Sequence, residues 1–254
     1  MQLTLLGCGS SAGTPVIGCR CATCSSDNPR NRRTRCSAAI TTRGGEVILI
    51  DTGPDLRTQA LRESMERVDA VLYTHTHADH LHGIDELRSF CQIQRMQIPL
   101  YGHPDHLSVI DARFHYAVRS PAGNWDLPIL SLNPLLEAAS ICGVTVTPIP
   151  AHHGRSMVYG YRIGDMAYLT DVSEIPPASL QLLRGLDLLL LDCLRYEPHH
   201  THINLEQSLA YAGLIGADRT FLIHMTHELE YGALESLLPQ GVHAGYDGLK
   251  LNFD

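Results

Sequence analysis

The stretch THTHADH, residues 74–80, places four side chains that can bind a metal ion within six residues: His75, His77, Asp79 and His80. Imidazole suits zinc and other first-row metals, and a carboxylate adds the negative charge that a divalent ion requires. In an extended segment His75, His77 and Asp79 would point to one side and His80 to the other. Core packing alone seldom gathers four such residues, so we predict a metal site here that can serve two ions.

Short apolar runs elsewhere in the chain also end on a residue that can bind a metal ion or accept a proton. Their aliphatic and β-branched residues favour buried strands. In α/β proteins the loops at strand ends present such groups to a common crevice. Two ions need more ligands than residues 74–80 provide, and we expect them from one of the two adjacent histidines, from Asp171 and from His224. The runs end at Asp51, His75, His152 and His153, Asp171, Asp192 and His224.

Helical spacing of apolar residues appears between some of these runs, in residues 53–64, 82–96 and 204–217. Asn204 and Gln207 stand at the cap and third positions of the last one. Strands and helices alternate without an internal repeat and without a linker rich in Pro, Gly or Ser. We therefore predict an α/β protein with one domain, residues 1–254.

Composition and charge restrict the class of protein. The N-terminal residues MQLTLLGCGSSAGTP have no basic region typical of a signal peptide, and no run approaches the roughly 18 apolar residues of a membrane span. We expect a cytoplasmic protein without membrane contact. The net charge of -8 argues against a nucleic-acid partner. One basic segment, with Arg30, Arg32, Arg33 and Arg35, either meets an anionic group or forms a solvated turn paired with acids.

Three cysteines crowd into GCRCATC, residues 18–24: Cys19, Cys21 and Cys24. In a reducing cytosol such a cluster more often binds metal than forms disulfides. The spacing suits a tetrahedral zinc ion with a fourth ligand from elsewhere, for which Cys36 is the nearest unassigned thiol. A redox role is less favoured, because the motif is not the Cys-x-x-Cys arrangement of redox proteins. We expect a zinc-binding loop near residues 18–36.

In order and spacing these motifs resemble the metallo-β-lactamase fold hydrolases, whose H-x-H-x-D-H signature is followed by a histidine, a bridging aspartate and a final histidine. The resemblance implies a four-layer αβ/βα sandwich with two metal ions at one edge, between its sheets. His153 is chosen over His152 because it stands just ahead of the turn GRSMVYGYRI; His152 is expected in an outer or surface position. The implied ligands are His75, His77 and His153 for one ion, Asp79, His80 and His224 for the other, and Asp171 as the bridge.

The resemblance extends from LLGCGSSAGTPVIGC to YDGLKL, almost the whole chain, and is closest to the phosphodiesterases of the carbon-phosphorus lyase pathway, which act on a ribosyl cyclic phosphate. These share the early cysteine motif, a histidine just before a helix and a late pair of histidines. This implies His202 and Asp79 as catalytic residues, and a homodimer. It also implies a structural zinc site of Cys19, Cys21, Cys24 and His227.

We therefore predict a metal-dependent phosphoric diester hydrolase whose partner is a small cyclic or linear phosphodiester. Two divalent ions, manganese or zinc with iron or nickel as alternatives, would hold a bridging hydroxide that attacks phosphorus. His202 would protonate the leaving group, or else be a surface histidine. Asp51 and Asp192 would either orient metal-bound imidazoles or form turns bonded to their own backbone. The turn is favoured for Asp192, and both readings stay open for Asp51.

Other functions fit parts of the same pattern. Endoribonucleases that process transfer RNA 3′ ends share the ligands, but they usually have a substrate-gripping arm inserted between the third histidine and the bridging aspartate. In this chain only seventeen residues separate His153 and Asp171. A thioester hydrolase of the glyoxalase II type is compatible with the ligands alone. Di-iron oxygen or nitric oxide reductases typically have Glu where His77 stands. A non-enzymatic metal-binding or cofactor-handling protein with a degenerate site is the remaining alternative.

Overall fold

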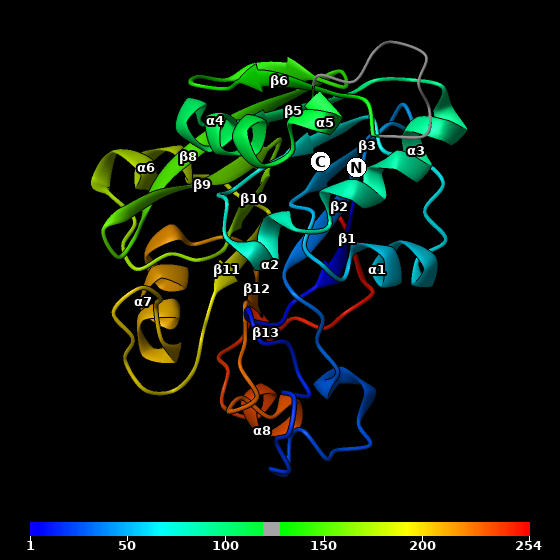
Figure 1. The fold of residues 1–254 in the computed structure, drawn as a ribbon. Helices are drawn as coiled ribbons and strands as arrows, with labels where there is room; N and C mark the ends of the chain where they lie inside the picture. Colours follow the sequence, from blue (N-terminus) through cyan, green and yellow to red (C-terminus); the bar gives the residue numbers. More distant parts are fainter. Residues whose placement is uncertain (119–127) are drawn as a thin grey trace.

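Two sheets face each other in the computed structural model, which describes residues 1–118 and 128–254; within these ranges each sheet has seven strands (Figure 1). The first has the order β14-β1-β2-β3-β4-β5-β6 and the second the order β13-β12-β11-β10-β9-β8-β7. In the first, strands β14 to β3 pair antiparallel and β3 to β6 parallel. The second follows the same plan, antiparallel from β7 to β10 and parallel from β10 to β13.

The bounds of the strands and helices are as follows. The first sheet contains β1 (Gln2–Gly7), β2 (Ser37–Thr41), β3 (Val47–Ile50), β4 (Ala70–Leu72), β5 (Ile98–Gly102), β6 (Leu130–Pro134) and β14 (Leu249–Asn252). The second contains β7 (Ala139–Ile141), β8 (Val144–His153), β9 (Ser156–Ile163), β10 (Met166–Leu169), β11 (Leu188–Asp192), β12 (Arg219–Ile223) and β13 (Val242–Ala244). The α-helices are α1 (Leu56–Arg62), α2 (Ala78–Leu81), α3 (Leu87–Gln94), α4 (Pro104–Arg113), α5 (His115–Val118), α6 (Pro177–Leu182), α7 (Leu205–Ile215) and α8 (Tyr231–Glu235).

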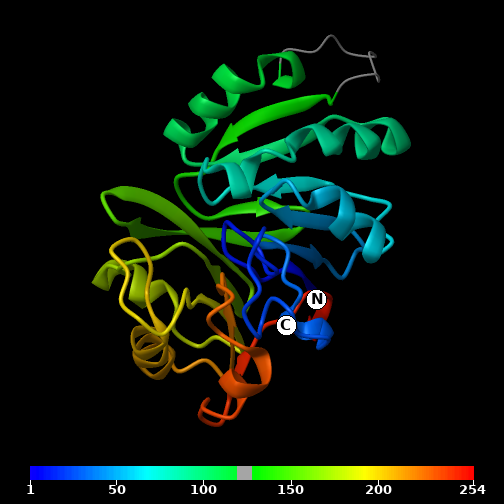
Figure 2. The same ribbon diagram turned by 60° about the horizontal axis from the view of Figure 1, so that its bottom comes forward.

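The central strands, such as β3 and β11, are buried on both faces, as their continuous apolar runs predict, whereas β8 and β14 have exposed positions. In β3, Ile48 and Ile50 join the core between the two sheets, whereas Leu49 faces the core under the helices of the first sheet. In β11, Leu190 joins the core between the sheets and Leu189 the one beneath α6 and α7. Helices cover the outer faces of both sheets (Figures 1 and 2). The four-layer sandwich is confirmed.

One local prediction is wrong. Residues 74–80 are not extended throughout, because residues 78–81 form the single helical turn α2. The backbone carbonyl of His80 accepts a hydrogen bond from Thr52 N–H at 2.8 Å, and Thr52 in turn accepts one from Gly83 N–H at 2.8 Å. The loop after β3 therefore holds this turn in place through contacts distant in sequence. The predicted helices at 53–64, 82–96 and 204–217 are present as α1, α3 and α7.

Candidate metal centre

The ends of six strands or of the loops that follow them meet at one edge between the two sheets. The first sheet supplies Asp51 after β3 and residues 75–80 after β4. The second supplies the end of β8, the residues after β10 and β12, and the end of β11. Because the polar side chains stand at the ends of buried strands, the sheets hold them in place while the loops bring them together.

Three groups of potential metal ligands form at this edge, and in each group the ligand atoms lie within 4.8 Å of one another. Asp171 belongs to the first and the second group, as expected of a bridging carboxylate, and the third group is Asp192, His202 and His224. The residues of the first two groups are those implied by the sequence resemblance, and His153 is one of them. His152 is exposed, and its backbone N–H donates to the carbonyl of Glu174. The first group is His75, His77, His153 and Asp171; the second is Asp79, His80, Asp171 and His224.

Three of the strand-end residues adopt a left-handed backbone conformation. The φ angles are 59° at Asp51, 57° at Asp171 and 58° at His224. Few residues other than glycine adopt this conformation, and those that do cluster at functional sites where the surrounding fold enforces it. Each strand therefore turns sharply at the residue that enters the site.

Two buried imidazole nitrogens without hydrogen-bond partners are independent evidence that these side chains fit a metal site. His80 Nε2 and His224 Nε2 are buried and have no hydrogen-bond partner. Both face carboxylates: His80 Nε2 lies 3.1 Å from Asp171 Oδ1 and 3.3 Å from Asp79 Oδ2, and His224 Nε2 lies 3.4 Å from Asp171 Oδ1. Buried polar atoms normally have hydrogen-bond partners, so two unpaired imidazole nitrogens that face carboxylates fit a metal site. Imidazole and carboxylate are the donors that zinc and manganese accept.

Burial and neighbouring charges divide the imidazoles into two kinds. Burial lowers the pKa of His75 well below its usual value, and it also lowers the pKa of His153. Burial opposes the charged form of His80 as well, but the carboxylates of Asp171 and Asp51 raise its pKa well above the usual value. The pKa of Asp171 is held far below its usual value despite burial, chiefly by His224 and His80. The second group is therefore more strongly charged than the first.

Orienting groups hold the other ring nitrogen of several of these histidines. His80 Nδ1 donates to Asp51 Oδ2 at 2.7 Å, and the same carboxylate accepts hydrogen bonds from the backbone N–H and hydroxyl of Thr74. His153 Nδ1 donates to the backbone carbonyl of Thr201 at 2.8 Å. Such contacts fix the tautomer and leave Nε2 to the metal. The open question at Asp51 is answered in favour of an orienting contact, and the carbonyl of Thr201 carries no signal in the sequence.

His202, the expected proton donor, lies beside the second group and is 8% exposed, so the alternative of a surface histidine is not supported. Its ring stacks on that of His224, with centroids 4.7 Å apart and planes 13° apart. His202 Nδ1 is 3.1 Å from Asp192 Oδ2. The preference for a turn bonded to its own backbone at Asp192 is wrong, because this side chain, which is fully buried, contacts His202 and the backbone N–H of Val172.

A separate group gathers Cys19, Cys21, Cys24 and His227, whose ligand atoms also lie within 4.8 Å of one another. The two shortest contacts to His227 Nδ1 are 3.4 Å from Cys19 Sγ and 3.3 Å from Cys21 Sγ. The backbone N–H of Cys24 and then His227 lower the pKa of Cys21 to about 6. A thiolate at neutral pH suits zinc. Cys36 is buried outside this group, so its candidacy as the fourth ligand is not supported.

Three of the four arginines of the basic segment contact other parts of the protein, whereas Arg32 is exposed. Arg33 is buried, and its guanidinium donates to two backbone carbonyls within residues 226–229. Arg35 forms an ion pair with Asp55 at 2.8 Å, and the guanidinium of Arg30 lies over two tyrosine rings. These contacts favour the interpretation as a structural turn over that of an anion site.

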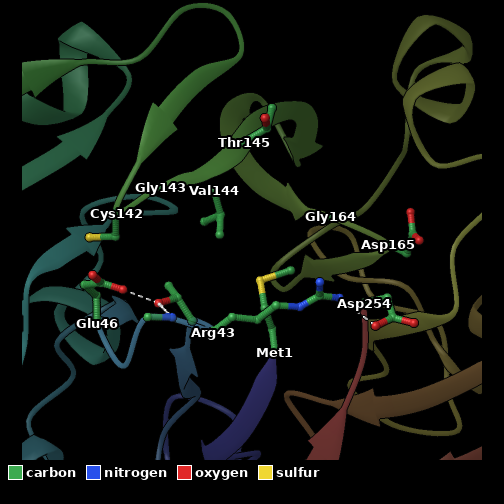
Figure 3. Close-up of a pocket in the computed structure, with 12 residues that line it drawn as sticks. Met1, Arg43, Glu46, Cys142, Gly143, Val144, Thr145, Gly164, Asp165 and Asp254 are labelled. Atoms are coloured by element: carbon green, nitrogen blue, oxygen red, sulfur yellow. Dashed lines mark hydrogen bonds and ion pairs between the residues drawn. The ribbon is translucent and has the colours of Figure 1, made fainter.

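A surface cavity of about 530 Å³ lies at the opposite ends of the strands (Figure 3). It is lined by Met1, by the turns around Arg43 and Gly143, and by Asp165 and Asp254. Strand β8 begins at this cavity and ends at His153, so its ten residues separate the two regions by about 30 Å. The cavity contains none of the potential ligands.

Comparisons with known proteins agree with this geometry. The model of the family described as the beta-lactamase superfamily domain matches residues 46–225. A solved structure of a diphosphatase from the PhnP family is 41% identical, with all of this chain and 98% of that chain covered and a TM-score of 0.92. Zn²⁺-bound PqqB from Methylobacterium extorquens is 23% identical over the full length of both chains, with a TM-score of 0.79, and shows the shared fold.

A curated relative, an octanoyltransferase of Porphyromonas gingivalis, is 38% identical over 259 residues, which cover 100% of this chain and 52% of that protein. The chain spans about half the length of the curated relatives it matches. The remaining half of the Porphyromonas protein has no counterpart here, so its name describes that longer protein. The family match and the fold together show that the chain belongs to the beta-lactamase superfamily and has the metallo-β-lactamase fold.

Proposed function

We propose that the protein is a phosphodiesterase that uses two divalent ions to cleave a small cyclic or linear phosphodiester. The observation that carries the proposal is Asp171, which belongs to the first and the second ligand group, with His202 buried alongside. Ions bound there would activate a water molecule for attack on phosphorus and offset the negative charge of a substrate oxygen. The seven side chains of these two groups would hold them, with manganese or zinc as the expected metals.

The residues of the chain would supply the proton that the leaving group needs. His202 Nε2 lies 3.9 Å from Asp171 Oδ2, at the margin of these two groups. A leaving oxygen becomes negatively charged as its bond to phosphorus breaks, so a proton from His202 lowers the barrier. Asp79 is assigned a ligand role and a catalytic one. Its side chain is 13% exposed, so its carboxylate can contact both an ion and a reacting water molecule.

The comparisons support a phosphorus-centred reaction. The PhnP-family structure at 41% identity is that of a diphosphatase, which favours hydrolysis of a diphosphate as a second candidate. Transfer RNA processing is not supported, because His153 and Ser156 pair within a tight hairpin and Ile163 pairs with Met166 across the next turn. The segment between the third histidine and the bridging aspartate therefore holds no inserted arm.

The test is to load the protein with manganese or zinc and assay bis(p-nitrophenyl) phosphate, a ribosyl cyclic phosphate and a diphosphate ester. We expect metal-dependent hydrolysis of a diester, and a loss of at least a hundredfold in His77→Ala, whose metal content is measured in parallel. Preference for the diphosphate would favour the second candidate. No metal-dependent hydrolysis of any of the three would overturn the proposal.

We further propose that Cys19, Cys21, Cys24 and His227 bind one structural zinc ion. The four ligand atoms are of the Cys₃His type and approach one another closely. We expect Cys21→Ser to lower bound zinc by one ion and to reduce stability, while the metal content of the Asp171 site stays the same. An unchanged zinc content would contradict this assignment.

The homodimer and the cytoplasmic location stay predictions. In the described ranges, none of the helices has the length and apolar character to span a membrane.

A further inference from the structure

Asp192 stands where the proposed proton donor and a proposed metal ligand meet. Its carboxylate is fully buried at the end of β11. Oδ2 lies 3.1 Å from His202 Nδ1 and accepts the backbone N–H of Val172, also at 3.1 Å. Oδ1 lies 3.5 Å from His224 Nδ1, and neither of these two buried atoms has a hydrogen-bond partner. One carboxylate thus faces both histidines and the residue after the bridging aspartate.

We propose that Asp192 is a positioning residue that fixes His202 and His224 together, so that the proton donor and the metal ligand keep one relative geometry. The inference rests on the proposed function for the role of His202. With Nδ1 of both rings directed at the same carboxylate, both Nε2 atoms point towards Asp171. The stacked rings, 4.7 Å apart, are then oriented as a pair rather than singly.

Backbone contacts around Asp192 fix the position from which its carboxylate projects. The hydroxyl of Ser208, in the first turns of α7, donates to the backbone carbonyl of Asp192 at 2.7 Å. The backbone N–H of Cys193 donates to Ile223, the residue before His224, at 2.9 Å. Strand β11 pairs with β12 up to the register of Asp192 with Ile223. The position of Asp192 is therefore determined by β11, β12 and α7 at once.

The reaction step that this arrangement serves can be written in full. Water would attack phosphorus as hydroxide, after passing one proton to solvent. The bond between phosphorus and the leaving oxygen breaks with its electron pair on that oxygen, which takes the proton from His202 Nε2. The ring then becomes neutral and retains its Nδ1 proton on Asp192 Oδ2. His202 regains a proton from solvent before the next turnover. A proton matters most for a poor leaving group, so a misplaced His202 slows poor leaving groups more than good ones.

Asp51 provides a matched control. It is also a fully buried strand-end carboxylate, and it also orients an imidazole, that of His80. In the described part of the chain, however, it makes no contact with His202. Asp51→Asn should therefore weaken metal binding without altering the dependence of rate on the leaving group.

The experiment compares Asp192→Asn and Asp51→Asn on methyl aryl phosphodiesters whose leaving groups run from p-nitrophenol to phenol. In Asp192→Asn we expect the rate with phenol to fall at least tenfold more than the rate with p-nitrophenol. In Asp51→Asn we expect equal losses. His202→Ala should show the same dependence of rate on the leaving group as Asp192→Asn. The double variant Asp192→Asn/His202→Ala should not change this dependence further. Equal losses across the series in Asp192→Asn would overturn the proposal.

A second readout does not depend on activity. Long-range proton–nitrogen spectra of the metal-free protein, at a pH where the ring is neutral, should show His202 as the Nδ1–H tautomer, with Nε2–H appearing in Asp192→Asn but not in Asp51→Asn. An unchanged tautomer in Asp192→Asn would contradict the inference even if the protein proves to have no diesterase activity. Asp192→Glu, which shifts the same charge by one methylene, replaces the Asn variant in both measurements if that variant does not fold.

Discussion

The carboxylates around His80 determine its state before any metal binds. Asp171 and Asp51 raise the pKa of His80 well above the usual value, whereas burial lowers the pKa of His75. In metal-free protein at neutral pH, His80 therefore carries a proton that His75 lacks. A metal ligand must give up this proton, so metal and protons compete at the second group.

This competition predicts that metal binding releases protons and weakens as the pH falls. The raised pKa of His80 means that below it each binding event displaces a proton, so the apparent affinity rises with pH until the folded pKa is passed. Titration calorimetry of zinc in buffers of different ionisation enthalpy measures the number of protons released. A heat of binding that does not depend on the buffer would contradict this expectation.

The cysteine group makes a second prediction at the scale of single residues. The pKa of Cys21 is lowered to about 6, whereas burial raises that of Cys24 to about 11. In zinc-free protein, alkylation of Cys21 by iodoacetamide should rise through about pH 6 and exceed that of Cys24 at pH 7. Peptide mass spectrometry measures both sites. Added zinc should protect Cys21, and equal labelling of the two thiols at pH 7 would refute the assignment.

At the scale of elements, α7 fixes the loop that carries His202. The side chain of Asn204 accepts the backbone N–H of Gln207, and the Gln207 side chain accepts the backbone N–H of Asn204, which completes a capping box. Asn204 also donates to the carbonyl of Tyr196 at 2.9 Å. The cap thus closes the segment between β11 and α7 over the candidate site.

Asn204→Ala is therefore expected to lower the free energy of unfolding by about 1 kcal/mol. It should also reduce diesterase activity, because the loop with His202 and Thr201 loses its anchor. Urea denaturation and the diester assay measure the two effects. Leu214→Ala, on an exposed position of the same helix, serves as the control and should change stability by less than about 0.5 kcal/mol without affecting activity. Equal effects of the two variants would count against this role of the cap.

The elements differ in how far the sequence predicts them. The helix α7 carries its own start signal in Asn204 and Gln207, and the strands are marked by uninterrupted apolar runs. The turn α2 is not marked in this way, because it depends on Thr52, which is distant in sequence, donating its backbone N–H to the carbonyl of His80 and accepting a hydrogen bond from the N–H of Gly83. The role of Asp192 could have been inferred from its position at the end of an apolar run, which it shares with Asp51. That of Thr201 could not, since it acts through its backbone carbonyl.

At the scale of the whole molecule, the candidate centre joins the two sheets. Residues 75–80 follow a strand of the first sheet, whereas His153, Asp171 and His224 stand at the ends of strands, or just beyond them, in the second. Ions bound between them would connect the two layers across the edge of the shared core. This arrangement follows from the order of strands in both sheets, which the motif alone does not contain. The family resemblance supplied the four-layer sandwich and the position of the ions at one edge between its sheets, but not the strand order.

Metal binding should therefore stabilise the folded protein as a whole. With free metal at 100 times its Kd, the expected gain is about 2.7 kcal/mol for each ion. Thermal unfolding with and without manganese measures it. His153→Ala should lose the part of the gain that comes from the ion of the first group, whereas His152→Ala, at the neighbouring exposed position, should keep the whole gain. A similar loss in both variants, or no shift in wild type, would contradict the placement of the site between the sheets.

The left-handed backbone at Asp51, Asp171 and His224 has a consequence for how such a site tolerates sequence change. Asp, Asn and His are the residues other than glycine that enter this conformation most readily, and Asp and His are also metal ligands or partners of ligands. Two separate selective pressures, one for chemistry and one for backbone shape, therefore narrow the permitted residues to the same few. Substitution by Ala, Val or Leu would both remove the ligand or its partner and strain the left-handed backbone. Asn is the substitution that removes the charge or the ligand but still adopts this backbone conformation readily.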